Sequence, residues 1–514
     1  MDRRSFLLAS AATLVLSRAQ AQMNMQSMMG DGMRGMTGMG HKAVPLPEGA
    51  TFRELPRLAN QATGPGVFTA TLTAAPGTAE FVPGLSTPIL AYNGHSPGPL
   101  IEVNEGDQVA LHFINNVGED STIHWHGLPV PAAQDGAAMA PVANGTDRIY
   151  SFTLPVGFSA TCWYHPHPHM KTAEQVYRGL AGAFIVKPQH DPVPAPYGDT
   201  VLQITDLRLA ADGSMPADSM IDQMNGRVGD HLLVNGLKNP VLEVAAGTRR
   251  RFRLLNTTNA RFLRLSFGAA PFTLLGTDGG YLEASVPGQS EVFLPPASRL
   301  DVVVDFAEPG SYVLQTLEFD HGWMGPMRPS DAGQTLLSVK VNTTKATPLP
   351  PLPARLRDIE NPGTPVLMRR LVLGESMGGM GKGGMGMGGR SMGGMGMGGM
   401  GMAMTINNRS FDMNRVDLTS KVGQLEMWEV QNPTDMDHPF HIHGNSFQLH
   451  EIVDLKTGAT TPPPRKALVD IVNVPRGKAA RLMVRQMLPG LRMYHCHILE
   501  HEDMGMMGLV DVRA

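Results

Sequence analysis

Histidine recurs at a spacing of two along this sequence. The 514-residue chain has 18 histidines and five His-x-His pairs, whereas random placement would give about 0.6 such pairs. The pairs are His124/His126, His165/His167, His167/His169, His441/His443 and His495/His497. Residues i and i+2 of a strand point to the same face, so each pair offers two imidazoles on one side of a sheet. Four converging pairs could enclose a cluster of metal ions.

Cys496 lies between two of these histidines. If His495 and His497 face one way in a strand, Cys496 faces the other way, toward a different metal ion. Further ligands are available at His438, His501 and Met506. Two histidines, one cysteine and a weak axial methionine form the ligand set of a blue copper electron-transfer site. Zinc is the competing metal, but the Cys-x₂-Cys spacing typical of structural zinc sites is absent.

The chain has only two cysteines, Cys162 and Cys496. In an oxidising compartment the default interpretation of two thiols is one disulfide. The histidines beside Cys496 favour a metal-ligand role instead, and Cys162, followed by Trp163-Tyr164, is interpreted as a buried free thiol. A Cys162–Cys496 disulfide would contradict the copper interpretation.

The elements that position these side chains follow from a weak threefold repeat. Each copy reads as a turn, a strand with alternating apolar residues and a second turn, which is typical of a sandwich of short antiparallel strands. The copies run from Asn93 to Asn115, from Asn235 to Asn256 and, more faintly, from Ile406 to Asn432. We predict an all-β chain with sandwich domains at 45–190, 198–345 and 366–514, and a Pro-rich linker at 346–365. The middle domain has only His231 and His321, widely separated, and is predicted to hold no metal.

Composition excludes several classes of partner. The formal charge of −4 is too balanced to indicate nucleic acid or an anionic membrane surface. With 42% hydrophobic residues the chain can bury large cores. No internal run approaches the roughly 20 apolar residues of a membrane span.

The N-terminus resembles an export signal. Arg3-Arg4 precedes an apolar stretch that ends at Leu16, and Ala19-Gln20-Ala21 follows. We predict a cleavable signal of the twin-arginine type at 1–21, with a short membrane anchor as the less favoured alternative. The expected location is the periplasm, reached through the twin-arginine export machinery.

Methionine is concentrated in two tracts. Seven of the 35 methionines lie between Met23 and Met39, within segment 22–44, and ten more lie in the Gly/Met-rich insert 377–404. Glycine-rich sequence cannot form a packed core, so both tracts are expected to be mobile. Thioether sulfur selects Cu(I), so copper capture is favoured over the alternative of a simple linker.

Taken together, the motifs identify a family resemblance that covers essentially the whole mature chain. They are His124-Trp125-His126-Gly127, His165-Pro166-His167, the segment from His438 to Gly444, and His495-Cys496-His497 continuing to Met506. The sequence resembles the three-domain multicopper oxidases, most closely the bacterial periplasmic cuprous oxidases. The resemblance implies three consecutive cupredoxin-like Greek-key β-sandwich domains and four copper ions: one type 1, one type 2 and two type 3.

The resemblance also assigns ligands. The type 2 copper would take His124 and His441. The type 3 pair would take His126, His165, His167, His443, His495 and His497. The type 1 copper would take His438, Cys496, His501 and Met506. His169 matches no ligand.

Acidic residues near these motifs suggest proton delivery and substrate binding. Asp135 and Glu502 match the family's acids near the cluster, and either could donate protons or anchor a ligand imidazole. Asp435, Met436 and Asp437 are candidates for a substrate-copper site, with an ordinary polar turn as the alternative. The family's methionine-rich helix is replaced by insert 377–404, whose glycine content argues against a continuous helix.

These features predict an enzyme that couples one-electron oxidation of Cu(I) to reduction of O₂ to water, as a monomer that detoxifies periplasmic copper. The first alternative is a laccase-like oxidase of phenols and aromatic amines. The second is non-enzymatic, either a copper-storage protein or a division-type scaffold, although a scaffold would be expected to have lost ligands.

Overall fold

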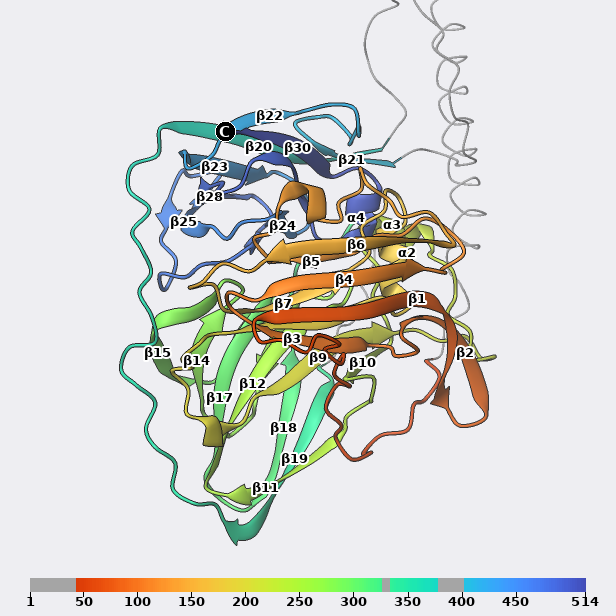
Figure 1. Cartoon of the computed structure of the whole chain (residues 1–514), viewed down its shortest axis with the longest axis vertical. Helices are drawn as coiled ribbons and strands as arrows, with labels where there is room; N and C mark the ends of the chain where they lie inside the picture. Colours follow the sequence, from red (N-terminus) through yellow and green to blue (C-terminus); the bar gives the residue numbers. More distant parts are fainter. Residues whose placement is uncertain (1–42, 326–332, 378–401) are drawn as a thin grey trace, which may run out of the picture. The chain divides into compact units, whose positions relative to one another are not determined.

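A computed structural model describes residues 43–325, 333–377 and 402–514. The predicted signal, nearly all of segment 22–44 and most of insert 377–404 lie outside the described residues. Pro45–Ala514 forms one compact unit whose regular structure is almost entirely strand (Figure 1). Among the described residues, no helix has the length and apolar character needed to cross a membrane.

Two four-stranded sheets form the first sandwich, with strand orders β2-β1-β4-β6 and β3-β8-β7-β5. Their strands are β1 (Val67–Val82), β2 (Leu85–Tyr92), β3 (Gly98–Asn104), β4 (Gln108–Asn115), β5 (His124–His126), β6 (Thr146–Thr153), β7 (Ala160–His165) and β8 (Gly182–Lys187). Along β1, Phe68, Ala70 and Leu72 are buried while the intervening threonines are partly exposed. This period of two places the apolar face of the sheet on the core.

A six-stranded and a five-stranded sheet form the second sandwich, with orders β10-β9-β12-β17-β14-β15 and β11-β19-β18-β13-β16. The strands are β9 (Thr200–Leu207), β10 (His231–Val234), β11 (Val241–Ala246), β12 (Thr248–Asn256), β13 (Leu263–Ser266), β14 (Phe272–Thr277), β15 (Gly280–Gln289), β16 (Val292–Leu294), β17 (Arg299–Phe306), β18 (Gly310–Leu317) and β19 (Thr335–Lys345). Residues 346–365 contain neither helix nor strand.

The third sandwich repeats this plan, with orders β21-β20-β23-β28-β25-β26 and β22-β30-β29-β24-β27. The strands are β20 (Leu367–Met377), β21 (Met402–Ile406), β22 (Leu418–Lys421), β23 (Leu425–Asn432), β24 (His438–Ile442), β25 (Gln448–Asp454), β26 (Thr460–Thr461), β27 (Ile471–Val474), β28 (Lys478–Arg485), β29 (Gly490–Cys496) and β30 (Met507–Arg513). The prediction of three cupredoxin-like sandwiches is confirmed.

The threefold repeat has a common structural basis. Each copy opens on a turn whose first asparagine has a left-handed backbone, with φ of 50° at Asn93, 50° at Asn235 and 55° at Asn407. Each of these side chains also accepts a backbone N–H from a neighbouring strand, at 2.7, 2.9 and 2.8 Å respectively. Asparagine tolerates this backbone conformation, and its side-chain oxygen accepts a backbone N–H of the neighbouring strand. These two properties explain its recurrence.

In the described part of the chain, the helices are short and lie at the connections. They are the 3₁₀ helices η1 (Ala132–Gln134) and η2 (Ala195–Tyr197) and the α-helices α2 (Thr172–Tyr177), α3 (Met220–Asn225) and α4 (Leu499–Asp503). Both α2 and α3 contact α4 (Figure 1). Since α2 belongs to the first sandwich region and α3 to the second, α4 of the third is held by both.

The three sandwiches share a fourth apolar cluster besides their own cores. It includes Trp163 from the first, Leu255 from the second and Ile471 from the third, all at most 3% exposed. Burial of such side chains contributes about 1.5–3 kcal/mol each. This shared cluster packs the sandwiches directly against one another where the histidine motifs meet.

We predict that Leu482→Ala, at a fully buried site in the third core, lowers the free energy of unfolding by about 2–5 kcal/mol, because a cavity adds to the lost transfer energy. Urea denaturation monitored by tryptophan fluorescence measures the change. Val156→Ala, at a 71% exposed site, is the control and is expected to stay within about 0.5 kcal/mol. Equal shifts in both variants would contradict the assigned core.

Candidate metal centre

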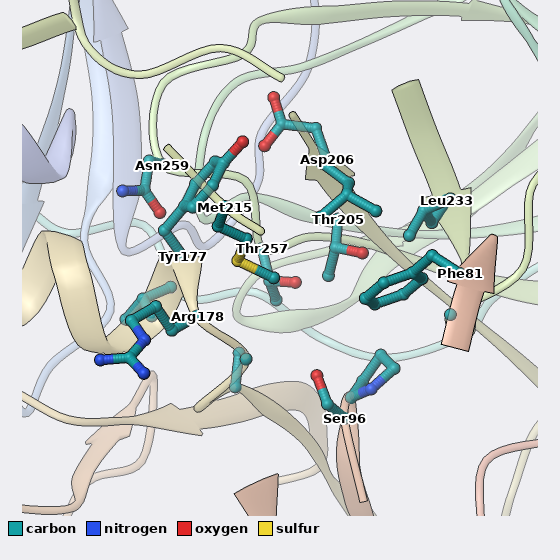
Figure 2. Close-up of a pocket in the computed structure, with 16 residues that line it drawn as sticks. Phe81, Ser96, Tyr177, Arg178, Thr205, Asp206, Met215, Leu233, Thr257 and Asn259 are labelled. Atoms are coloured by element: carbon teal, nitrogen blue, oxygen red, sulfur yellow. The ribbon is translucent and has the colours of Figure 1, made fainter. Parts of the chain in front are cut away.

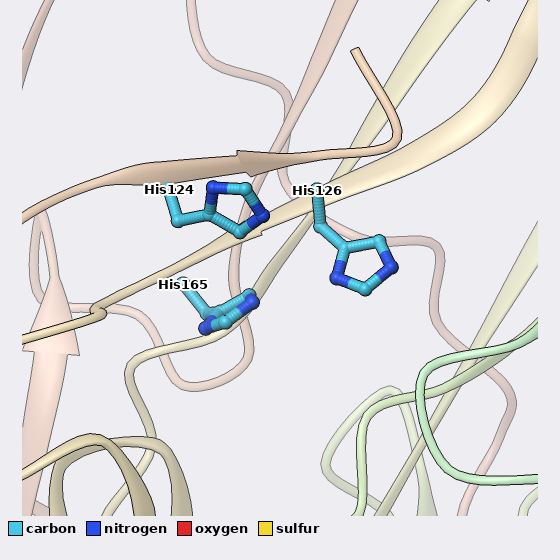
Figure 3. A group of neighbouring side chains, drawn as sticks. All are labelled: His124, His126 and His165. Atoms are coloured by element: carbon cyan, nitrogen blue, oxygen red, sulfur yellow. The ribbon is translucent and has the colours of Figure 1, made fainter. Parts of the chain in front are cut away.

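The first two histidine motifs meet through β5 and β7. These strands are antiparallel, with His124 opposite His165 and His126 opposite Trp163. Strand alternation sends Trp125 to the other face, where it is fully buried in the first core. Figure 3 shows His124 and His126 extending from one strand, with His165 beside them.

The second two motifs meet in the same way in the third sandwich. β24 and β29 are antiparallel, with His441 opposite His495 and Phe440 opposite Cys496. The two imidazoles therefore share one face, and Cys496 shares the other face with Phe440 in the third core. The predicted alternation along His495-Cys496-His497 is present in the structure.

The four motifs converge into one buried cluster. All eight histidines are at most 1% exposed; they are His124, His126, His165, His167, His441, His443, His495 and His497. Rings from the first and third sandwiches stack directly, with centroids 3.8 Å apart for His124 and His443 and 3.9 Å apart for His126 and His441. The middle sandwich contributes no member to the metal-competent groups found among the described residues.

Burial keeps seven of these imidazoles neutral. Loss of solvation lowers the pKa of His126, His165, His167, His441, His443 and His497 well below the usual value. The pKa of His124 is lowered for the same reason. A neutral imidazole has a lone pair, which a metal ligand requires.

Several of these nitrogens have no hydrogen-bond partner among the residues that the structure describes. His124 Nε2, His126 Nδ1, His165 Nε2 and His441 Nε2 are buried without a hydrogen bond, as are both ring nitrogens of His497. A buried polar atom without a partner costs about 1–3 kcal/mol, so a set of them needs an explanation. Metal ions enclosed by the cluster would satisfy them.

The contact between His443 and His495 also indicates a metal ion. His443 Nδ1 lies 2.8 Å from Asp135 Oδ2, and His495 Nδ1 lies 2.9 Å from the Cys496 carbonyl oxygen. Since those acceptors fix the protons on Nδ1, two Nε2 lone pairs face each other at 3.0 Å. Such an arrangement is repulsive unless a cation lies between the two nitrogens, so the residues fit a bound metal.

A second group surrounds the Cys496 sulfur on the opposite face of β29. His438 Nδ1 lies 3.4 Å from Sγ and His501 Nδ1 lies 4.0 Å from it. Met506 is fully buried, and its backbone bonds to Cys496 on one side and His501 on the other. Burial raises the pKa of the Cys496 thiol, so copper must displace its proton, as thiolate ligation requires. Two histidines, a cysteine and an adjacent methionine fit a type 1 copper site.

Comparisons with known proteins agree with this geometry. Three family models, each described as multicopper oxidase, match residues 73–191, 201–330 and 390–514. The multicopper oxidase mco of Staphylococcus haemolyticus is 32% identical over 448 residues, which cover 86% of this chain and 88% of that protein. The chain belongs to the multicopper oxidase family.

Two further likenesses bear on its function. A solved structure described as a multicopper oxidase from Campylobacter jejuni, a metallo-oxidase, superimposes with a TM-score of 0.82 at 35% identity, covering 93% of this chain and 98% of the other. The cell division protein FtsP of Photorhabdus laumondii is 32% identical over 440 residues, covering 82% of this chain and 84% of its own. Multicopper oxidases carry copper and reduce O₂ with electrons from a reducing substrate, so this chain is an oxidoreductase.

Both predicted acids of this multicopper oxidase contact the cluster. The Asp135 carbonyl oxygen lies 3.0 Å from His124 Nδ1, while its carboxylate holds His443. Glu502 Oε2 lies 3.1 Å from His495 Nδ1. These contacts match the anchoring role that the sequence left open.

Sequence reasoning missed Asp470, which holds two cluster histidines. Its carboxylate oxygen Oδ1 lies 3.1 Å from His126 Nε2, and its carbonyl oxygen lies 2.8 Å from His441 Nδ1. The available signal was a fully buried acid in the apolar run 468–472, Leu-Val-Asp-Ile-Val. A charge in such a run requires a buried partner.

Glu375 was also missed. Its Oε1 lies 3.1 Å from His438 Nε2, which Thr434 Oγ1 also approaches at 2.9 Å. The other histidine beside Cys496 is also hydrogen-bonded within the protein: His501 Nε2 donates to the Met224 carbonyl oxygen at 3.0 Å. Both type 1 histidine candidates are fully buried, whereas the Glu375 side chain is 13% exposed.

The predicted substrate-copper residues do not form one exposed group. Met436 is fully buried in the third core. Asp437 accepts hydrogen bonds from Asn473 Nδ2 and the Arg476 backbone N–H, and burial raises the pKa of its carboxyl. Only Asp435 is exposed. The contacts of Met436 and Asp437 are those of a structural turn before β24.

His169 and Cys162 lie apart from the metal-competent groups. His169 is half-buried and its ring packs against Phe411, with centroids 5.2 Å apart. Cys162 is fully buried in the first core, and burial raises the pKa of its thiol to about 12. Neither Cys162 nor Cys496 forms a disulfide.

A separate small cavity lies between the first two sandwiches. Tyr177, Asp206, Met215 and Asn259 are among its lining residues (Figure 2), and none of the predicted metal ligands lines it. Because it lies apart from the predicted ligands, this cavity is not part of the metal centre.

We predict that neither thiol of the copper-free native protein reacts with Ellman's reagent at neutral pH, because both are buried and have raised pKa values. After unfolding in denaturant with a chelator and no reductant, two thiols per chain should react. Absence of reactive thiols in the unfolded chain would reveal a disulfide and contradict the site.

Proposed function

We propose that this multicopper oxidase couples one-electron oxidation of Cu(I) to four-electron reduction of O₂, and that it detoxifies copper in the periplasm. Four Cu(I) ions are oxidised to Cu(II) while one O₂ takes up four electrons and four protons and gives two water molecules. The chain would hold four copper ions of its own, at the Cys496 site and in the histidine cluster. The Campylobacter jejuni relative, described as a metallo-oxidase, supports a metal ion as electron donor.

The observation that carries the proposal is the environment of His438 and His501. Both rings are fully buried, and their outer nitrogens bond to protein groups. A phenol would need an exposed ring edge through which to pass its electron. Glu375 instead offers a partly exposed carboxylate in contact with His438, which suits a small cation. These contacts favour a metal ion over the laccase-like alternative.

The residues of the chain would each take a defined part. Glu375 binds the incoming cation next to His438. His438 contacts Cys496 Sγ, and the peptide bonds of Cys496 join the cysteine site to His495 and His497. When bound, copper supplies the one-electron steps that together reduce O₂. Asp135 and Glu502 orient His443 and His495, and they are placed to pass protons into the buried cluster.

The predicted methionine tracts and export signal complete the proposal. The Gly/Met-rich insert leaves β20 and re-enters β21 at the paired residues Met377 and Met402, two positions beyond Glu375. Its thioethers would capture Cu(I) and pass it to Glu375. The Arg3-Arg4 pair supports twin-arginine export to the periplasm, where copper toxicity would be countered.

The likeness to FtsP suggests a non-enzymatic alternative. In this chain, however, every residue predicted as a ligand of the cluster or the cysteine site is present and buried. An oxygen electrode separates the alternatives, because a scaffold or storage protein would take up copper without consuming O₂. Catalytic O₂ consumption on addition of Cu(I) is the expected result.

We predict that the copper-loaded protein is intensely blue and that Cys496→Ser abolishes this colour, because a thiolate ligand produces the band. Copper analysis of the same variant should show loss of one of the four bound ions, since the histidine cluster does not use the sulfur. Visible spectroscopy and elemental analysis measure both quantities. A blue Cys496→Ser protein would rule out the assigned cysteine ligand.

We predict that Glu375→Gln lowers kcat/KM for Cu(I) about tenfold or more, because a hydrogen bond or contact to a charged group contributes about 1.5–3 kcal/mol. Oxidation of a phenol should change less than twofold. Asp435→Asn, which alters the exposed acid of the neighbouring turn, is the matched control and should leave both rates near wild type. If Glu375→Gln lowers kcat/KM equally for Cu(I) and for the phenol, Glu375 acts by holding His438 and does not bind the substrate cation.

Deletion of residues 378–401, with a short Gly-Ser turn joining β20 to β21, tests the contribution of the insert. The Cu(I) rate alone should fall, or bulky organic donors should gain, if the insert captures copper. Unchanged rates for both donors would leave the insert as a linker.

A further inference from the structure

A buried arginine of the metal-free middle sandwich reaches the cluster ligands. Arg299, the first residue of β17, is fully buried. Its Nη1 and Nη2 donate to the two carboxylate oxygens of Asp470 at 2.6 and 2.5 Å. Two parallel bonds of this kind fix the plane of the carboxylate as well as its position.

The remaining N–H groups of Arg299 bind backbone carbonyls in the first and second sandwiches. Nε donates to Thr161 at 2.7 Å, Nη1 to Ala297 at 3.2 Å and Nη2 to Asp278 at 3.2 Å. All five donors of the guanidinium are therefore used. The side chain joins the three sandwiches at one point and cannot rotate without breaking several bonds.

Asp470 transmits this fixed position to two histidines. Its carboxylate accepts from His126 Nε2, and its carbonyl oxygen accepts from His441 Nδ1. Each bond places the proton on the bonded nitrogen and leaves the other nitrogen with a lone pair. Those other nitrogens, His126 Nδ1 and His441 Nε2, are buried without partners in the protein.

His126 thereby differs from five of the other cluster histidines. His124, His165, His441, His443 and His495 are each held through Nδ1. His126 is held through Nε2 and offers Nδ1 to the cluster. The ion pair of Asp470 and Arg299 accounts for this reversal.

The glycine that follows the first motif belongs to the same arrangement. Gly127 has φ of +87°, and a Cβ there would lie 2.4 Å from Arg299 Nη2 and 2.8 Å from Asp470 Oδ2. The backbone after His126 therefore passes directly over the ion pair. Only glycine combines this conformation with this close approach.

We propose that Arg299 is a positioning residue for copper binding: through Asp470, the middle sandwich selects which nitrogen His126 and His441 present to the metal. The inference rests on the proposed copper occupancy of the histidine cluster and not on the identity of the electron donor. It gives the ligand-free sandwich a role in assembling the centre.

The test compares copper-loaded wild type with Arg299→Lys, which keeps the charge but has a single nitrogen in place of the planar fork. Chelator titration should show cluster copper bound 10–100-fold more weakly, the usual effect of losing a group that orients a ligand. The blue band of the Cys496 copper should keep its wild-type intensity and chelator resistance. Arg251→Lys, a buried arginine of the same sandwich paired with Asp301, is the matched control and should leave both sites unchanged.

Asp470→Asn provides a second variant that keeps the side-chain shape and the carbonyl bond to His441. Selective ¹⁵N labelling of histidine in the copper-free proteins should show His126 protonated on Nε2 in wild type and a mixture of tautomers in both Arg299→Lys and Asp470→Asn. Cluster copper within twofold of wild type with an unchanged tautomer would overturn the proposal, as would equal copper loss in Arg251→Lys. Failure of wild type itself to bind cluster copper would instead count against the proposed function.

Discussion

The alternation of side chains along an extended strand is the constraint on which this molecule depends. Cys496, the last residue of β29, leaves the face opposite to that of His495, and His497, the first residue after the strand, lies with His495 in the cluster. The sulfur is thereby committed to one site and the two imidazoles to another, and the connection between the sites is only a few covalent bonds. A helix through the same residues would spread the three side chains around its axis and destroy both groups. The rest of the fold serves to hold β5, β7, β24 and β29 so that their histidine faces meet.

Desolvation gives these faces their chemical character. A histidine at the surface is partly protonated near neutral pH, whereas burial lowers the pKa of cluster histidines such as His126 and His441 and keeps them neutral. The same burial makes unpaired nitrogens and facing lone pairs energetically unfavourable in the empty protein. Metal binding removes that unfavourable free energy. Folding of the surrounding sandwiches therefore contributes to the metal affinity of the centre.

The sequence alone was sufficient for the parts that repeat locally. A period of two identified the histidine pairs and the opposed Cys496, and Asn-containing turns identified three sandwiches. Asp470 and Glu375 were beyond this reasoning, because they lie 29 or more residues from the ligands they contact. Arg299 lies 171 residues from Asp470, through which it acts. All three reach the site only through strand order and sandwich packing. Composition also suggested the turn at Asp435–Asp437 as a substrate-copper site, which stays a prediction. There the structure buries Met436 in the third core and ties Asp437 to β27 and its following loop.

The pairing of Met377 with Met402 has an implication for how such a chain can diversify. Because the polypeptide leaves and rejoins the sheet at one rung of a hairpin, an insertion there displaces no core residue. The free-energy cost of such an insertion is that of loop closure, which increases by only about 0.6 kcal/mol for each doubling of loop length. The inserted stretch can therefore be lengthened, shortened or recomposed with little effect on the stability of the sheet that carries it.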